Sequence, residues 1–235
     1  MSKKSKEHDE AKYGLSPVGA VQKEIASTIA VQDFQAAYYE KGNIPVKKEP
    51  KLLIAIPTCE EDKALEDACR ATWAKKRDDV DIVFFDGETL GVADEYEQLP
   101  IKVQAICRWA VEHDYDFMLK VDSDTFVWVD RILASGFEQH DYSGWTGGKA
   151  AAKDEYCSGG AGYFLSRRAM EVIAEAQLPA DTCEDRVVGR LLYDAGIKLH
   201  RNVNHAHGRH EEITPELLTM HPCRSLEWMK KMEED

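Results

Sequence analysis

Short apolar runs alternate with helical stretches from residue 51 onward, and this rhythm limits the possible folds more than any other feature. Runs at 52–56, 81–85 and 117–121 have the length of buried strands, and residues 64–76 and 100–112 have the apolar spacing of helices. Strands joined through helices predict an α/β fold with a mostly parallel central sheet flanked by helices. In such sheets ligands bind at the carboxyl ends of the strands.

The first 50 residues do not share this rhythm. Residues 1–16 are charged and predict a polar tail, whereas residues 17–39 carry apolar side chains at spacings of three to five, which predicts an amphipathic helix. We therefore expect an N-terminal region of tail and helix over 1–50 and a single α/β domain over 51–235.

Charge and composition exclude several classes of protein. The 235 residues include 30 Lys and Arg against 43 Asp and Glu, a net charge of −13 that argues against a nucleic-acid-binding surface. No run of 18 apolar residues and no secretory signal is found, so we expect a cytoplasmic chain without a transmembrane anchor. The six cysteines lack a Cys-x-x-Cys pair, which favours free thiols over a zinc site.

Asp122 and Asp124 are the most informative pair of side chains. They follow the apolar strand 117–121, and residues i and i+2 of an extended chain point to the same side, so the two carboxylates can converge on one cation. Carboxylate oxygens suit Mg²⁺ or Mn²⁺. A solvated acidic turn is the alternative, but a position at the end of a strand favours the cation site. A haloacid-dehalogenase-type phosphatase would need a different spacing, because Thr125 follows Asp124 directly.

Two further segments indicate a site. Glu184 and Asp185 stand at the start of a helix, where the helix dipole favours carboxylates and could by itself explain them as caps. Gly189 inside that helix costs about 1 kcal/mol relative to Ala, which indicates close packing. The glycine-rich stretch 159–162 requires the backbone to approach another group closely.

Taken in order, five segments resemble the β-1,3-galactosyltransferase and Fringe-like family, glycosyltransferase family 31. They are residues 70–73 (RATW), 83–87 (VFFDG), 120–126 (KVDSDTF), 156–166 (YCSGGAGYFLS) and 184–189 (EDRVVG). The resemblance implies a GT-A fold and an inverting, metal-dependent enzyme. Such an enzyme moves a hexose (galactose, N-acetylglucosamine or glucose) from a UDP-sugar to an acceptor hydroxyl with a β-linkage. The chain departs from the family at Ser123, where many members have a third acid, and at Arg186, where many have Val.

The resemblance also implies roles for individual residues. Asp124 would bind Mn²⁺ or Mg²⁺ directly, and Asp122 would contact the metal or the ribose. His221, in a closing Met-His-Pro segment, would be the third metal ligand ahead of His207, His205 and His210. Asp185 would be the general base, oriented by Glu184. Further contacts to the donor nucleotide sugar are expected from Thr58, Arg70, Asp86, Lys120, Ser123, Gly159 and Gly160.

The acceptor stays open at this point. A glycan, a lipid, a protein, a small molecule or even a modified base of a nucleic acid could supply the hydroxyl, and Trp145 beside glycines could stack on a sugar. A non-catalytic module that binds a metal and a nucleotide sugar is the alternative function. The presence of both Asp122–Asp124 and Glu184–Asp185 argues against it, because a pure binder needs only the first pair.

Overall fold

The computed structural model describes residues 50–146, 154–208 and 213–234. The predicted N-terminal tail and amphipathic helix lie outside these residues, as do Gly147, Gly148 and His210.

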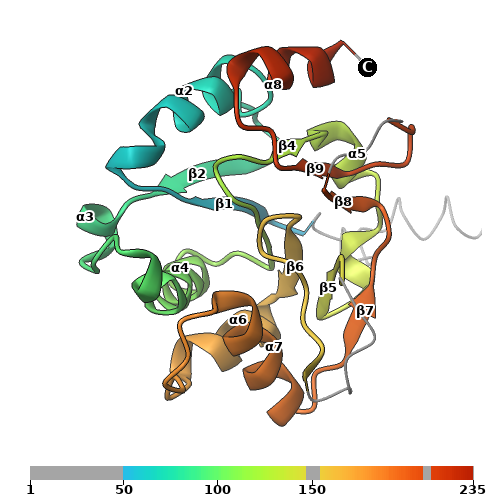
Figure 1. Cartoon of the computed structure of the whole chain (residues 1–235). Helices are drawn as coiled ribbons and strands as arrows, with labels where there is room; N and C mark the ends of the chain where they lie inside the picture. Colours follow the sequence, from blue (N-terminus) through green and yellow to red (C-terminus); the bar gives the residue numbers. More distant parts are fainter. Residues whose placement is uncertain (1–49, 147–153, 209–212, 235) are drawn as a thin grey trace, which may run out of the picture. The chain divides into compact units, whose positions relative to one another are not determined.

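A mixed six-stranded sheet forms the centre of the described domain (Figure 1), which confirms the predicted α/β class. Its strand order is β2-β1-β3-β6-β5-β7. The strands are β1 Leu52–Pro57, β2 Asp81–Phe85, β3 Phe117–Lys120, β5 Tyr142–Gly144, β6 Tyr163–Ser166 and β7 Leu199–Arg201. Neighbouring strands are parallel except at β6, which is antiparallel to both β3 and β5. Because β6 is reversed, its first residue, Tyr163, pairs with the last residue of β3, Lys120.

Helices cover both faces of this sheet. α4, α6 and α7 pack together on one face, while α2 and α8 pack against each other on the other side (Figure 1). The α-helices are α2 Lys63–Ala71, α3 Gly87–Leu90, α4 Leu99–Glu112, α5 Val129–Leu133, α6 Arg167–Glu175, α7 Glu184–Asp194 and α8 Leu226–Glu233. Three single turns of 3₁₀-helix lie at Glu60–Asp62, Tyr96–Gln98 and Phe137–Gln139.

A second sheet of three short strands carries the end of the chain back to the centre. It has the order β4-β9-β8, from β4 Phe126–Val127, β9 Thr219–His221 and β8 His205–His207. β4 begins two residues after Asp124 and pairs antiparallel with β9, Phe126 opposite Met220. This pairing places a segment from the last twenty residues beside the turn that follows β3.

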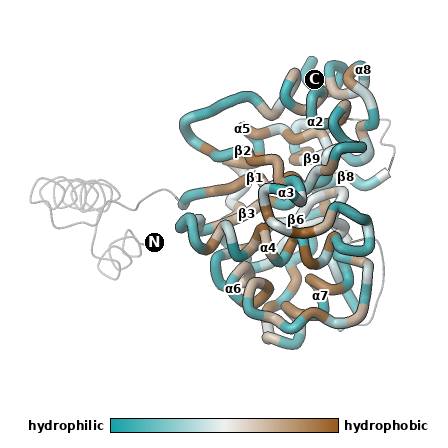
Figure 2. The backbone as a smooth tube through the Cα atoms, turned by 90° about the vertical axis from the view of Figure 1, so that its left-hand side faces the viewer, coloured by the Kyte–Doolittle hydropathy of each residue, from teal (hydrophilic) through white to brown (hydrophobic). Residues whose placement is uncertain are grey.

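Strand β1 shows why the central runs are continuously apolar. Its alternate side chains enter two different cores: Leu52, Ile54 and Ile56 pack on the α2 and α8 side. Leu53 and Ala55 pack on the side of α4, α6 and α7. A strand buried on both faces has no polar alternation. Figure 2 shows the result as a hydrophobic centre enclosed by more hydrophilic outer turns.

One predicted boundary is wrong. The helix expected over 64–76 ends at Ala71, because the Thr72 hydroxyl bonds to the carbonyl of Ala68 at 2.8 Å and Thr72 has left the helical conformation. Trp73 is thereby turned into the core. The six cysteines, which all lie in the described ranges, are unpaired, and four of them are buried.

Gly189 gives a test of the packing between α7 and the neighbouring loop. A Cβ on Gly189 would lie 2.6 Å from the Cβ of Tyr156 and 2.9 Å from the carbonyl oxygen of Glu155. Gly189→Ala should therefore lower the free energy of unfolding by about 1 kcal/mol or more, despite the higher helix preference of Ala. Urea unfolding measures this change, with the exposed Arg190→Ala on the same helix as the control. An unchanged or raised stability would contradict the close packing.

Candidate functional site

The turn after β3 brings Asp122 and Asp124 together. β3 ends at Lys120, and the amide of Thr125 donates to the carbonyl of Asp122 at 3.1 Å, so the pair sits in a turn and not in the extended strand that the sequence suggested. The Thr125 hydroxyl donates to the carbonyl of Gly160 at 2.7 Å, which ties this turn to the glycine-rich segment before β6. The expected convergence of the two carboxylates is therefore produced by a tight turn.

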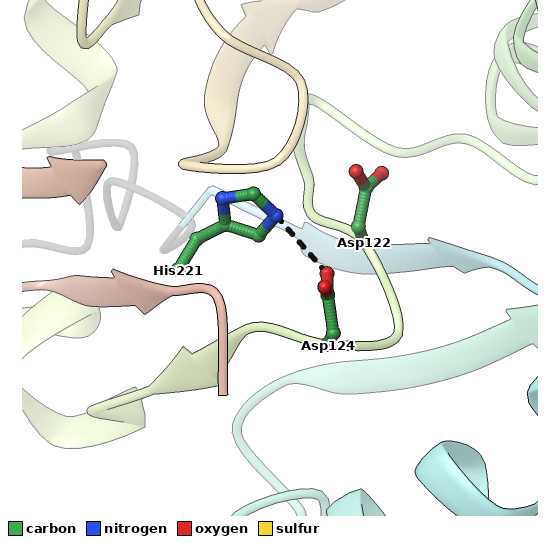
Figure 3. A group of neighbouring side chains, drawn as sticks. All are labelled: Asp122, Asp124 and His221. Carbon is green, nitrogen blue, oxygen red and sulfur yellow. Dashed lines mark ion pairs between the residues drawn. The ribbon is translucent and has the colours of Figure 1, made fainter. Parts of the chain in front are cut away.

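His221 completes a group of three possible metal ligands (Figure 3). One ligand atom from each of Asp122, Asp124 and His221 lies within 4.8 Å of the others. The Nε2 of His221 is 3.1 Å from Asp124 Oδ1, and it reaches this place because β9 pairs with β4. The two carboxylates suit Mn²⁺ or Mg²⁺, and the imidazole beside them favours Mn²⁺ over Mg²⁺, which prefers oxygen ligands.

Arg224 occupies the second oxygen of Asp124. Its Nε lies 3.1 Å from Asp124 Oδ2, so both oxygens of this carboxylate have partners. Burial by itself would raise the pKa of Asp124, but the hydrogen bonds from His221 and Arg224 together hold this pKa below its usual value. Asp124 is accordingly a carboxylate, the form that a cation would need.

A second cluster lies behind the first and is centred on Lys120. This side chain is 1% exposed, and its Nζ lies 2.6 Å from Asp122 Oδ1 and 3.3 Å from Glu184 Oε2. Burial would lower the pKa of Lys120, but Asp122, Glu184 and Asp185 raise it further, so the ammonium form is kept. Lys120 thus joins the predicted metal ligands to the acidic pair at the start of α7.

Glu184 and Asp185 differ in their surroundings although they are neighbours. Glu184 is buried and accepts hydrogen bonds from the Tyr163 hydroxyl and from Lys120. Asp185 is partly buried and accepts the amide hydrogen of Gly159 at 2.9 Å. Burial, and then the charge of Glu184, raise the pKa of Asp185 against the opposing effect of Lys120. A carboxylate with a raised pKa is a stronger base, which is what a general base requires.

The glycine-rich segment runs over both clusters without room for a side chain. A Cβ on Gly159 would lie 2.6 Å from Glu184 Oε2 and 2.6 Å from Lys120 Nζ, and would also meet Asp185. A Cβ on Gly160 would lie 2.5–2.8 Å from three atoms of the His221 ring. The close approach predicted for these glycines is therefore made to the side chains of the site itself.

A cleft of about 850 Å³ opens beside the predicted metal ligands. It is lined by Pro57, Thr58, Cys59, Glu61, Asp62, Ala64, Leu65, Asp94, Glu95, Tyr96, Leu99, Lys102, Asp122, Ser123, Asp124 and Arg224. Four of the predicted donor contacts are among them: Thr58, Asp122, Ser123 and Asp124. The cleft starts at the carboxyl end of β1, where α/β sheets bind ligands.

Arg70 and Asp86 do not line this cleft. Arg70 lies on α2, where its Nε is 2.8 Å from Glu66 and its guanidinium is 4.2 Å from the centre of the Phe84 ring. Asp86 caps α3 by accepting the amide hydrogen of Thr89 at 2.7 Å. Structural roles account for both side chains, and their proposed donor contacts stay predictions.

Several residues of the cleft were not expected from the sequence, and Lys102, Tyr96 and Arg224 are three of them. Lys102 is buried in α4, and its Nζ donates to the carbonyl of Thr58 at 2.7 Å and to Asp94. Tyr96 is 73% exposed at the rim, and Arg224 comes from the chain end. Of these three residues, only Lys102 had a signal in the sequence. It lies among the apolar residues of a predicted helix, and a buried charge there needs a polar partner.

The other two candidate histidines in the described residues are not part of this group of three ligands, although the His207 ring centre lies 5.1 Å from that of His221. His205 is fully buried, which lowers its pKa to about 4, and its Nδ1 is 3.0 Å from the Thr219 hydroxyl. His207 stacks on Trp145, with ring centres 4.8 Å apart, and its Nδ1 is 2.9 Å from the Ser158 hydroxyl. Among the described residues, His221 is therefore the histidine that shares a cluster with Asp122 and Asp124.

Comparisons with known proteins give a distant likeness. No protein-family model matches the chain. The structure is similar to a glycosyltransferase involved in the glycosylation of the major capsid of PBCV-1, at 16% identity and a TM-score of 0.45, covering 79% of this chain and 100% of that one. It is also similar to galactosyltransferase LgtC, at 10% identity and a TM-score of 0.43, covering 77% of this chain and 95% of LgtC. The function proposed below therefore rests on the geometry of the site.

Among the described residues, no helix combines the length and the apolar character that a membrane span requires.

The raised pKa of Asp185 predicts a pH-dependent stability. Its ordinary value is 3.8, so above that pH the folded chain keeps a proton that the unfolded chain has lost, and stability falls as the pH rises toward the raised pKa. Asp185→Asn removes the titrating carboxyl group, and with it this pH dependence of stability, and can keep the hydrogen bond from Gly159. The variant should be more stable than the wild type at pH 8, by about 1 kcal/mol or more, with the gain shrinking toward pH 4.

Urea unfolding at pH 4, 6 and 8 measures this difference. Asp194→Asn, an exposed substitution on the same helix, serves as the matched control and should show no gain that grows with pH. Parallel pH profiles for the wild type and Asp185→Asn would contradict the raised pKa.

Proposed function

We propose that this chain is a divalent-metal-dependent glycosyltransferase of GT-A type, similar to family 31, that transfers a hexose from a UDP-sugar to an acceptor hydroxyl. The observation that supports this proposal most is that Lys120 contacts both Asp122 and Glu184, and so links two clusters of acidic residues. One cluster, Asp122, Asp124 and His221, fits a cation at the edge of the cleft. The other contains a carboxylate of raised pKa, Asp185. Galactose, N-acetylglucosamine and glucose are the candidate sugars.

The donor nucleotide is assigned to the cleft. Its volume of about 850 Å³ lies within the range of small-molecule sites. Thr58 and Ser123 offer polar groups there, and the diphosphate is assigned to the end of the cleft where Asp122 and Asp124 lie. Mn²⁺ or Mg²⁺, when bound, would offset the negative charge that develops on the diphosphate leaving group.

The acceptor hydroxyl is assigned to the side of Asp185. Glu184 and Gly159 hold the Asp185 carboxylate in place, and its raised pKa suits removal of a proton from the hydroxyl as the oxygen attacks the anomeric carbon. A single displacement opposite the leaving group inverts that carbon, so an α-linked donor would give a β-linked product. Glycans, lipids, proteins, small molecules and modified nucleic-acid bases remain acceptor classes to be screened.

The alternative is a non-catalytic module that binds a metal and a nucleotide sugar. The cluster of Asp122, Asp124 and His221 would suffice for such a module. The second cluster favours the enzyme, because burying Lys120, Glu184 and a carboxylate of raised pKa costs stability and serves no need of binding. Release of UDP from UDP-galactose, UDP-glucose or UDP-N-acetylglucosamine distinguishes the two functions.

The first test removes the carboxylate on which the cation site depends. Asp124→Ala should abolish Mn²⁺-dependent UDP binding while the fold persists, because the cation that joins the protein to the diphosphate loses a carboxylate ligand. Titration calorimetry with UDP, with and without Mn²⁺, measures this loss. Asp130→Ala, an exposed substitution on the helix after β4, should bind like the wild type. UDP affinity that responds neither to a chelator nor to Asp124→Ala would overturn the metal-dependent assignment.

The second test separates chemistry from donor binding. Asp185→Asn should lower kcat by about 100-fold or more with little change in UDP affinity, since a general base acts on the acceptor. Asp194→Asn is again the matched control. Near-normal turnover in Asp185→Asn, or an α-linked product in the NMR coupling of the anomeric proton, would remove Asp185 from this role.

A further inference from the structure

Arg224 holds an oxygen that a metal ion would need. Its guanidinium lies 3.1 Å from Asp124 Oδ2, while His221 faces the other oxygen of the same carboxylate at 3.1 Å. The positive charge of Arg224 therefore lies beside Asp124, the first carboxylate of the proposed metal site. A divalent cation entering the site meets a like charge a few ångströms away, and that repulsion is strong near a partly buried carboxylate.

The cleft has few other cations. Among the described residues that line it, Glu61, Asp62, Asp94, Glu95, Asp122 and Asp124 are acidic, and Lys102 and Arg224 are basic. The Lys102 side chain is 5% exposed and is held by the carbonyl of Thr58 and by Asp94. Lys120 is buried behind Asp122.

Arg224, by contrast, is exposed to solvent. Its side chain is 76% exposed, and it reaches the cleft from the segment between β9 and α8. Any anionic group that enters this acidic cleft beside Asp124 has Arg224 as the available side-chain partner. A guanidinium can bind the oxygens of a phosphate with two parallel hydrogen bonds, which a lysine cannot do.

We propose that Arg224 is an exchangeable counterion: it pairs with Asp124 before the metal binds, and it moves to the diphosphate of the nucleotide once the metal has taken its place. This inference rests on the proposed function. It makes Arg224 a competitor of the metal and, in the next step, a ligand of the diphosphate.

Two effects of opposite sign follow for one substitution. Arg224→Gln removes the competing charge, so Mn²⁺ should bind several-fold more tightly in the absence of nucleotide. The same variant loses a charge-assisted contact to the diphosphate, so UDP should bind about tenfold or more weakly at saturating Mn²⁺. Uridine, which has no phosphate, should bind equally to both proteins. Arg224→Lys keeps the charge and should restore the wild-type Mn²⁺ affinity more fully than the UDP affinity.

Titration calorimetry on the full chain tests this in two stages, first with Mn²⁺ alone and then with UDP or uridine at saturating Mn²⁺. Arg190→Gln, which removes the same charge from an exposed site on α7, is the matched control and should change neither affinity. Opposite changes in Mn²⁺ and UDP affinity in Arg224→Gln support the proposal. Unchanged or weaker Mn²⁺ binding overturns it, and so does an equal loss of UDP and uridine binding.

Different results would contradict the proposed function and the role of Arg224. If the wild-type chain binds no Mn²⁺ and its UDP affinity ignores the metal, the proposed function falls and the role of Arg224 falls with it. If the wild type binds both ligands and Arg224→Gln behaves like Arg190→Gln, the counterion exchange alone is wrong.

Discussion

The site depends on the ion pairs of the buried Lys120 ammonium group with Asp122 and Glu184. Three carboxylates from two parts of the chain, Asp122, Glu184 and Asp185, all raise its pKa. Without a cation between them, these acidic groups would repel one another, and the cost would be largest for Glu184, which is buried beside Lys120. Lys120 therefore fixes the distance between the turn after β3 and the start of α7. Both proposed half-sites take their positions from it.

The reversal of β6 makes this arrangement possible. In a fully parallel sheet the glycine-rich segment would enter β6 at the edge opposite the carboxyl end of β3. The antiparallel pairing of Tyr163 with Lys120 brings it to the same edge. Gly159 then contacts the cluster around Lys120, and Gly160 contacts the ring of His221. The segment is held between the two groups of candidate site residues, which explains why neither position has room for a Cβ.

The sequence predicted local features well and distant pairings poorly. The apolar runs around β1, β2 and β3 identified the strands, and the position of Asp122 and Asp124 at the end of β3 predicted the group of possible metal ligands. Nothing in hydrophobic periodicity shows that β9 pairs with β4, and only the resemblance to a family favoured His221 over the other histidines. Arg224 and Tyr96 have no local signal, because their importance comes from where the loops bring them. The end of α2 was misjudged because the hydroxyl of Thr72 competes with the helix for the carbonyl of Ala68.

The pairing of β4 with β9 has a consequence for the chain as a polymer. Asp124 and Arg224 are 100 residues apart in sequence, and His221 lies three residues before Arg224. A metal ion held by Asp122, Asp124 and His221 would therefore close a long loop of the chain. Closing a long loop restricts the unfolded chain, and binding to the folded form alone adds stability by mass action. The cation would thus act as a removable crosslink. It would fasten the small second sheet to the large one, and its occupancy would set how readily the last strand and helix detach.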